Sequence, residues 1–277
     1  MILSFLDYFK YEFVIYALIA AILISVCASI LGVILVLKRY SYMGDGLSHI
    51  AFGAFAVAAV ANISNNLLII LPITILSAII ILKLGNNKKI KGDAIIAITS
   101  VSCLAFGYLI MSVFPKSSNI SGDVCESLFG STQILSLTLT DLILIITLTI
   151  VVIAFFIIFY HKIFAITFDE TFAKATGVKT EIYNLFISIL IAIVITLAMR
   201  LVGSLLISAL IIFPTLSAMR YVKSFKKVII LSVIISLITT LVGFILSLQL
   251  DTPIGPTIVI VDVIFFIISL IIRKIKK

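Results

Sequence analysis

Charged side chains are scarce in this chain: only 12% of its 277 residues are Asp, Glu, Lys or Arg, whereas 63% are hydrophobic. The apolar residues run in long blocks that a water-soluble core of this size does not need. The shortage of charge therefore excludes an ordinary soluble domain and indicates an integral membrane protein.

Two chemical signatures are also missing. The three cysteines, Cys27, Cys103 and Cys125, show no Cys-x-x-Cys spacing, so no disulfide framework is implied. A Walker A sequence is absent too: the nearest fragment, Gly-Val-Lys-Thr at 177–180, lacks the upstream glycine and the Gly-Lys order of a phosphate-binding loop. We therefore expect no ATP hydrolysis by that route and no enzymatic activity of the chain itself.

Uncharged runs long enough to cross a bilayer recur along the sequence, and they predict an all-α, polytopic membrane protein with eight or nine transmembrane helices. Residues 1–12 lack the basic start and small-residue cleavage site of a signal peptide, so the first run is expected to be a retained span. The predicted spans are Phe13–Leu37, Gly46–Ala61, Leu67–Leu82, Ala94–Phe114, Leu142–Tyr160, Ile182–Met199, Leu201–Met219, Val228–Leu250 and Pro253–Ile272.

The positive charges gather in a few short connections, which predicts the orientation of the chain. Five segments hold 17 of the 20 Lys and Arg residues, and cytoplasmic loops carry such an excess. This pattern favours a membrane role over nucleic-acid binding and places the carboxyl terminus in the cytoplasm. Because the longest polar connections have only about twenty residues, we expect one membrane domain over 1–277. The segments are Lys38–Arg39, Lys83–Lys91, Lys162–Lys179, Arg220–Lys227 and Arg273–Lys277.

Asp45 and His49 are the most informative polar residues. On a helix that starts near Asp45 they lie on one face, where a carboxylate and an imidazole could bind one divalent cation. The alternative is a capping aspartate beside a histidine that is hydrogen-bonded to a carbonyl. Ionisable groups inside a membrane are costly, which favours a functional role. Counting loops places Asp45 near the cytoplasmic end of its span, whereas a site in the metal path would lie deeper if residues 38–44 dip inward.

A second motif lies in the inner connection, residues 163–181. Thr167 as a cap, the acids Asp169 and Glu170, and a left-handed stop at Gly177 predict a short helix over about 167–178. Such a capped cytoplasmic helix suits the docking of a partner protein, although a plain surface helix fits the same residues equally well.

Four segments in order along the chain resemble the permease subunit of zinc, manganese and iron ABC importers. They are Tyr42–His49, the Asp169…Ala173…Gly177 loop, Val202–Pro214 and Asp251–Pro256. The resemblance implies a bacterial plasma-membrane protein that pairs with itself, with two cytoplasmic ATPase subunits and with an extracytoplasmic metal-binding protein. It implies no permanently bound cofactor, because the metal is the transported substrate.

The resemblance also assigns residues. Asp45 and His49 fall on the family's metal-path motif, and Asp169, Glu170, Ala173 and Gly177 fall on its ATPase-coupling loop. Zinc-type members often carry a histidine where this chain has Val101, so the resemblance slightly favours manganese or iron as the transported metal.

Three acids remain as weaker candidates. Asp123 and Glu126 lie in the outer connection, where they could receive metal or dock a binding protein, or simply be solvated. Asp262 lies within the last predicted span and could line the path. A rival hypothesis is a proton- or sodium-coupled secondary transporter that uses Asp45, His49 and Asp262 as a relay. A membrane metalloenzyme fits poorly, because no His-Glu-x-x-His motif is present.

Overall fold

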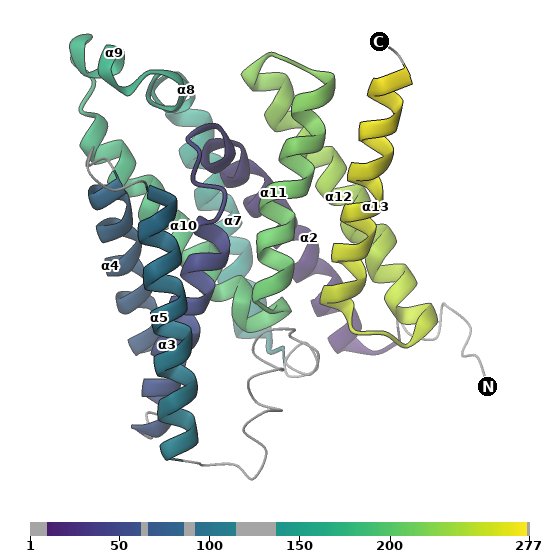
Figure 1. Ribbon diagram of the computed structural model, residues 1–277. Helices are drawn as coiled ribbons and strands as arrows, with labels where there is room; N and C mark the ends of the chain where they lie inside the picture. Colours follow the sequence, from purple (N-terminus) through teal and green to yellow (C-terminus); the bar gives the residue numbers. More distant parts are fainter. Residues whose placement is uncertain (1–9, 62–65, 86–91, 115–136, 276–277) are drawn as a thin grey trace.

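The structure is a computed structural model that describes residues 10–61, 66–85, 92–114 and 137–275. Within these ranges the chain is helical apart from short connections, and no strand occurs (Figure 1). The helices are α2 (Glu12–Leu37), α3 (Met43–Val60), α4 (Leu67–Gly85), α5 (Gly92–Val113), α7 (Leu139–Ile158), α8 (Tyr160–Phe168), α9 (Glu170–Ala175), α10 (Thr180–Val202), α11 (Ser204–Tyr221), α12 (Phe225–Leu250) and α13 (Ile254–Ile275).

The helix lengths confirm the predicted fold class. Eight of the described helices are long and apolar enough to span a membrane, namely α2, α3, α5, α7, α10, α11, α12 and α13. The apolar part of α4, Leu67–Lys83, is shorter. The chain is therefore a multi-pass helical membrane protein.

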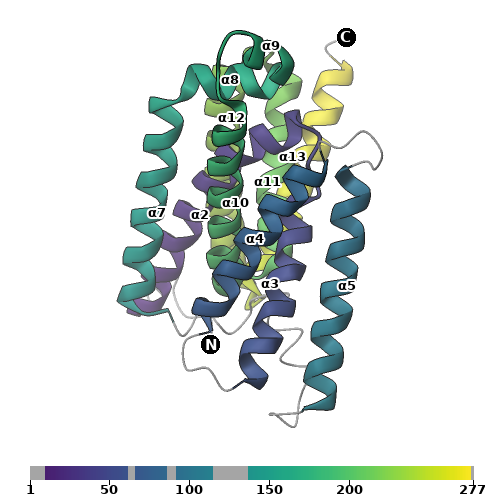
Figure 2. The ribbon, with the colours of Figure 1, turned by 90° about the vertical axis from the view of Figure 1, so that its left-hand side faces the viewer.

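The spanning helices lie side by side, and their ends separate into two groups. The short helices α8 and α9 lie at the same end of the bundle as the last turn of α13, on the other side of it, while α2 begins at the opposite end (Figure 1). Figure 2 shows α7 along one side and α5 along the other, with α2 and α10 between them. Helices α3 and α5 reach further than their neighbours at the end away from α9 (Figure 1).

Burial divides the spans into central and outer helices. In α2, 72% of the most apolar window is buried inside the bundle, against 28% in α5 and α7 and 22% in α13. The outer helices expose large aliphatic side chains such as Ile98, Ile157 and Ile260. Since lipid is as apolar as these side chains, their exposure matches a surface that faces a bilayer.

Small residues let the central helices approach closely. A Cβ atom on Gly53 of α3 would lie 2.8 Å from the Cys103 carbonyl oxygen of α5, and one on Gly107 would lie 3.0 Å from the Cα of Gly53. A Cβ on Gly32 of α2 would collide with the Ile211 carbonyl oxygen of α11. Close backbone contact through small residues is the usual way that helices pack in lipid.

A single glycine separates α10 from α11. Gly203 has φ +84° and ends α10, and α11 begins at the next residue. Only glycine adopts this conformation without strain. The sequence left open whether residues 182–219 form a tight hairpin or re-entrant pieces, and the structure shows two helices joined by this one-residue turn.

Candidate metal path and coupling helix

Asp45 and His49 come from the first two turns of α3 and face each other. The Nε2 atom of His49 lies 3.5 Å from Oδ2 of Asp45, and the two side chains are 19% and 50% exposed, respectively. The carboxylate occupies the first helical turn, where the helix dipole favours negative charge. The predicted i, i+4 pairing of an imidazole and a carboxylate is therefore present.

The glycines on either side of Asp45 allow this turn to pack tightly. A Cβ on Gly44 would meet Ile211 and Ser208 of α11, and a Cβ on Gly46 would meet Ile96 of α5. The start of α3 is thus held between α11 and α5. Asp45, between the two glycines, stays half exposed while both neighbours are buried.

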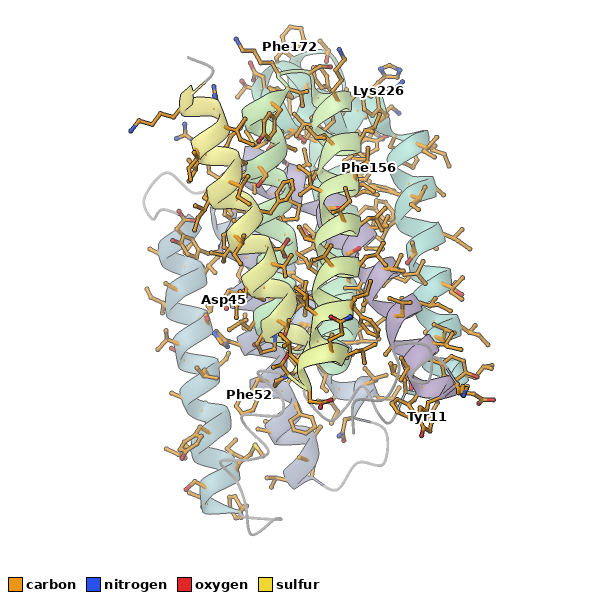
Figure 3. All side chains as sticks on the ribbon, turned by 90° about the vertical axis from the view of Figure 1, so that its right-hand side faces the viewer. Tyr11, Asp45, Phe52, Phe156, Phe172 and Lys226 are labelled. Carbon is orange, nitrogen blue, oxygen red and sulfur yellow. The ribbon has the colours of Figure 1, made fainter. Side chains whose placement is uncertain are left out.

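The Asp45–His49 pair lies at the start of α3 and below the end of the bundle. Figure 3 places Asp45 well below the end of the bundle that carries Phe172 and Lys226, and above Tyr11 at the opposite end. Asp45 is the third residue of α3, so it lies at the end of its span that loop counting predicted, and α3 itself starts below the end of the bundle that carries Phe172.

Two convergent ligand atoms are an incomplete coordination shell. The described residues contain no group of three His, Cys, Asp or Glu side chains that could hold a metal ion together. The Nδ1 atom of His49 is buried without a hydrogen-bond partner, so His49 has one ring nitrogen beside Asp45 and a second that faces protein. Such a shell would need water or a second chain to complete it.

The short helix α9 is the observed form of the predicted helix over 167–178. It spans Glu170–Ala175, and Asp169 is its cap: Oδ1 accepts the Phe172 amide at 2.9 Å and the Thr171 hydroxyl at 2.6 Å. These hydrogen bonds, that of the Phe172 amide foremost, lower the pKa of Asp169. The prediction that Thr167 caps this helix was wrong, because its buried hydroxyl donates to the Ile163 carbonyl inside α8.

Gly177 ends α9 as predicted. Its φ is +83°, its N–H donates to the Lys174 carbonyl, and the Val178 N–H donates to the Ala173 carbonyl, each at 3.0 Å. This is the Schellman pattern. Ala173 is fully buried against the bundle, whereas Phe172 is 63% exposed. One face of α9 is thus anchored and the other presents an aromatic side chain outwards.

Asp262, one of the three weaker candidates, does not join the Asp45–His49 pair. Asp262 is 1% exposed on α13, and among the described residues neither carboxyl oxygen has a hydrogen bond of normal geometry, although the Thr239 side chain of α12 lies nearby. It forms no ligand group with Asp45 and His49. Asp123 and Glu126 lie outside the described residues.

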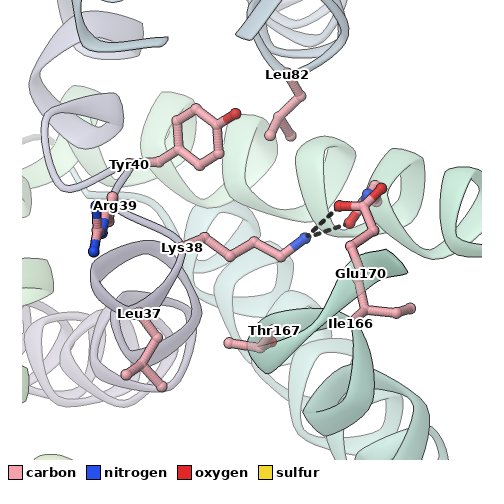
Figure 4. Close-up of a pocket in the computed structure, with 9 residues that line it drawn as sticks. Leu37, Lys38, Arg39, Tyr40, Leu82, Ile166, Thr167 and Glu170 are labelled. Atoms are coloured by element: carbon pink, nitrogen blue, oxygen red, sulfur yellow. Dashed lines mark hydrogen bonds and ion pairs between the residues drawn. The ribbon is translucent and has the colours of Figure 1, made fainter. Parts of the chain in front are cut away.

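Sequence reasoning missed Lys38, which the charge count treated only as an inner-loop marker. Its side chain is 12% exposed, and Nζ donates to Oδ1 of Asn184 on α10 at 2.6 Å and lies 3.8 Å from Oε2 of Glu170 on α9 (Figure 4). The sequence carries no local signal for this contact, because both partners lie more than a hundred residues further along the chain.

The fold and the Asp45–His49 pair together are those of a multi-pass helical membrane protein with a polar pair inside its helix bundle. Within that class, a model of the ABC 3 transport family matches residues 10–273, and the chain belongs to that family. It is 32% identical to the manganese import system permease protein ScaB of Streptococcus gordonii, over 91% of this chain and 88% of the relative. It is 30% identical to the high-affinity zinc uptake system membrane protein ZnuB of Haemophilus influenzae, over 95% and 99%.

Solved structures agree with this assignment. PsaBC from Streptococcus pneumoniae, solved in complex with Fab, superposes with a TM-score of 0.82 and 32% identity over 97% of this chain and 95% of that one. An inward-facing metal-chelate type ABC transporter shares the fold, with a TM-score of 0.71 and 15% identity. The predicted resemblance to metal ABC permeases is confirmed.

Proposed function

We propose that this chain is the membrane-spanning permease subunit of an ATP-binding cassette importer for a divalent transition metal ion, manganese, zinc or iron. Family membership supports the class of transporter, and relatives named for manganese and for zinc support the class of substrate. The observation that carries the substrate is the Asp45–His49 pair inside the bundle, since carboxylate oxygen and imidazole nitrogen both bind these ions.

In this proposal Asp45 and His49 hold the ion only in passing. Two ligands from one chain bind weakly, and water or the same pair from a second copy completes the shell. Weak, shared coordination suits conduction, because an ion that is held too tightly does not leave. The metal is therefore substrate rather than cofactor.

ATP hydrolysis belongs to a separate subunit that docks on α9. The capped helix with buried Ala173 and exposed Phe172 offers a fixed surface at the end of the bundle. We place this end, with the carboxyl terminus, in the cytoplasm of a bacterial plasma membrane. Two ATPase subunits, a second permease copy and an extracytoplasmic metal-binding protein complete the assembly.

A secondary transporter is the competing function. It would use Asp45, His49 and Asp262 as a proton or sodium relay, but Asp262 forms no group with the other two. A secondary carrier also needs no ATPase-docking helix. Uptake that stops when the proton gradient is collapsed while ATP persists would favour this rival.

The test is ATP-dependent uptake of Mn²⁺, Zn²⁺ and Fe²⁺ into cells or vesicles that carry the complete transporter. Asp45→Asn and His49→Ala are each expected to abolish most uptake of the transported ion while the complex still assembles. His161→Ala is the matched control, because His161 is exposed in the first turn of α8, at the end of the bundle. Parental uptake in both Asp45→Asn and His49→Ala would refute the ligand assignment.

A further inference from the structure

The connection between α2 and α3 links the α9 end of the bundle to the Asp45–His49 pair. Only residues 39–42 separate Lys38 from the first residue of α3. Backbone hydrogen bonds hold both ends of this link: the Tyr40 N–H donates to the Leu35 carbonyl at 2.8 Å, and the Met43 N–H donates to the Tyr40 carbonyl at 2.9 Å. A displacement of Lys38 must therefore reach the start of α3 with little slack.

The link is also packed against α5. A Cβ on Gly92, the first residue of α5, would lie 2.7 Å from the Tyr40 ring, so the ring rests directly on the α5 backbone. Arg39 adopts φ +62°, a conformation that is uncommon for a residue other than glycine. The chain thus makes a sharp, specific reversal here.

Lys38 connects this link to α9 and α10. Its ammonium group lies at a cavity of about 280 Å³ that Tyr40, Glu170 and Asn184 help to line. Burial lowers the pKa of Lys38, and the charge of Glu170 opposes that shift. A buried lysine without a partner is strongly disfavoured, so separating Lys38 from both Glu170 and Asn184 would be costly.

Glu170 forms the other side of the contact. It lies in the first turn of α9, directly after the Asp169 cap, and its side chain is 27% exposed. Lys174 lies 4.0 Å from Glu170 on the outer side, so the carboxylate stands between an exposed lysine and a buried one. Lys38, the buried one, is joined to α3 by residues 39–42.

We infer that Lys38 is a positioning residue that transmits movement of α9 to the Asp45–His49 pair, through its contacts with Glu170 and Asn184. This inference rests on the proposed function. It goes further by naming the side chain through which ATPase-driven motion reaches the metal ligands. Lys38 is neither one of the two proposed metal ligands nor a residue of α9.

The experiment measures metal ions taken up per ATP hydrolysed by the complete transporter in proteoliposomes. Lys38→Met keeps an unbranched side chain, one atom shorter, and removes its charge, and Asn184→Leu removes the oxygen that accepts the hydrogen bond of Lys38. Each is expected to lower the ratio about fivefold or more while the purified complex still assembles and hydrolyses ATP. The double variant should lose little beyond either single one, because both act on one contact. Lys38→Arg should restore most of the ratio.

Lys226→Met is the matched control: it is the same substitution, at an exposed lysine at the same end of the bundle (Figure 3). Its ratio should equal that of the parent. A parental ratio in Lys38→Met, or additive losses in the double variant, would overturn the inference and leave the proposed function intact. If Lys38→Met fails to assemble, Asn184→Leu decides by the same ratio. A parent without ATP-dependent uptake would overturn the proposed function and this inference together.

Discussion

Replacing Gly53 by alanine should force α3 and α5 apart. The new Cβ would lie 2.8 Å from the Cys103 carbonyl oxygen and 3.3 Å from its carbonyl carbon. The first distance is about 0.6 Å shorter than the 3.4 Å at which ordinary van der Waals contact begins. Both atoms belong to the α5 backbone, so no side-chain rotation relieves the overlap.

Gly44 in the same helix supplies the comparison that isolates this effect. A Cβ there would lie 2.9 Å from Ile211 Cδ1, the end of a side chain that can rotate, and its next neighbour is 3.7 Å away. Both substitutions gain helix propensity, at most about 1 kcal/mol each. Overpacking costs about 1–3 kcal/mol. Gly53→Ala should therefore be less stable than Gly44→Ala by about 1–3 kcal/mol.

The assay is equilibrium unfolding of both purified variants in detergent, followed by helix content. Gly53→Ala is expected to unfold at lower denaturant concentration, and Gly44→Ala at or above the parental midpoint. Equal free energies of unfolding for the two variants would refute the reasoning, since α3 and α5 could then move apart at Gly53 without loss of stability.

Three further outcomes follow from the structure. Thr74→Val should lower the free energy of unfolding by about 0.6 kcal/mol, because it removes the 2.9 Å hydrogen bond between the Thr74 hydroxyl of α4 and the Thr196 hydroxyl of α10. A double-mutant cycle with Thr196→Val measures this coupling energy, and a value of zero would contradict the prediction. Asp262→Asn should change the free energy of unfolding by less than about 1 kcal/mol, since the amide oxygen of asparagine can accept from the nearby Thr239 hydroxyl as the carboxylate can. A larger loss in thermal unfolding would contradict this. Because the folded pKa of Asp169 is lowered, its cap is fully present above the unfolded value of about 3.9 and is lost as pH falls through the folded value; amide exchange at Phe172 should accelerate in that range, and in Asp169→Ala should already be fast at neutral pH.

The number and type of helices could be predicted because hydrophobic length alone decides them. Runs such as Phe13–Leu37 have few alternatives in a bilayer, and the observed α2 differs by a residue at its start. The cap of α9 could not be chosen in the same way. Thr167 and Asp169 are both good caps, and only the extension of α8 to Phe168, with Thr167 buried in it, selects Asp169.

The candidate pair Asp45 and His49 could be predicted because i, i+4 spacing is a local property of a helix. Its depth in the bundle could not, because loop counting gives the order of the spans and does not show how far below the end of the bundle α3 begins. Lys38 was out of reach for another reason. Its burial depends on Asn184, which is 146 residues away along the chain, and no local pattern carries such a contact.

The one-residue turn at Gly203 has a mechanical consequence. Helix α10 has 23 residues and a length of about 35 Å. Gly203 joins one end of it to α11, and a connection of four residues joins the other end to α9. If α10 tilts about Gly203, its far end moves most: a tilt of about 5° would shift the end near α9 by about 3 Å and leave the end at Gly203 almost still. Such a tilt would therefore displace mainly the half of the bundle nearest α9.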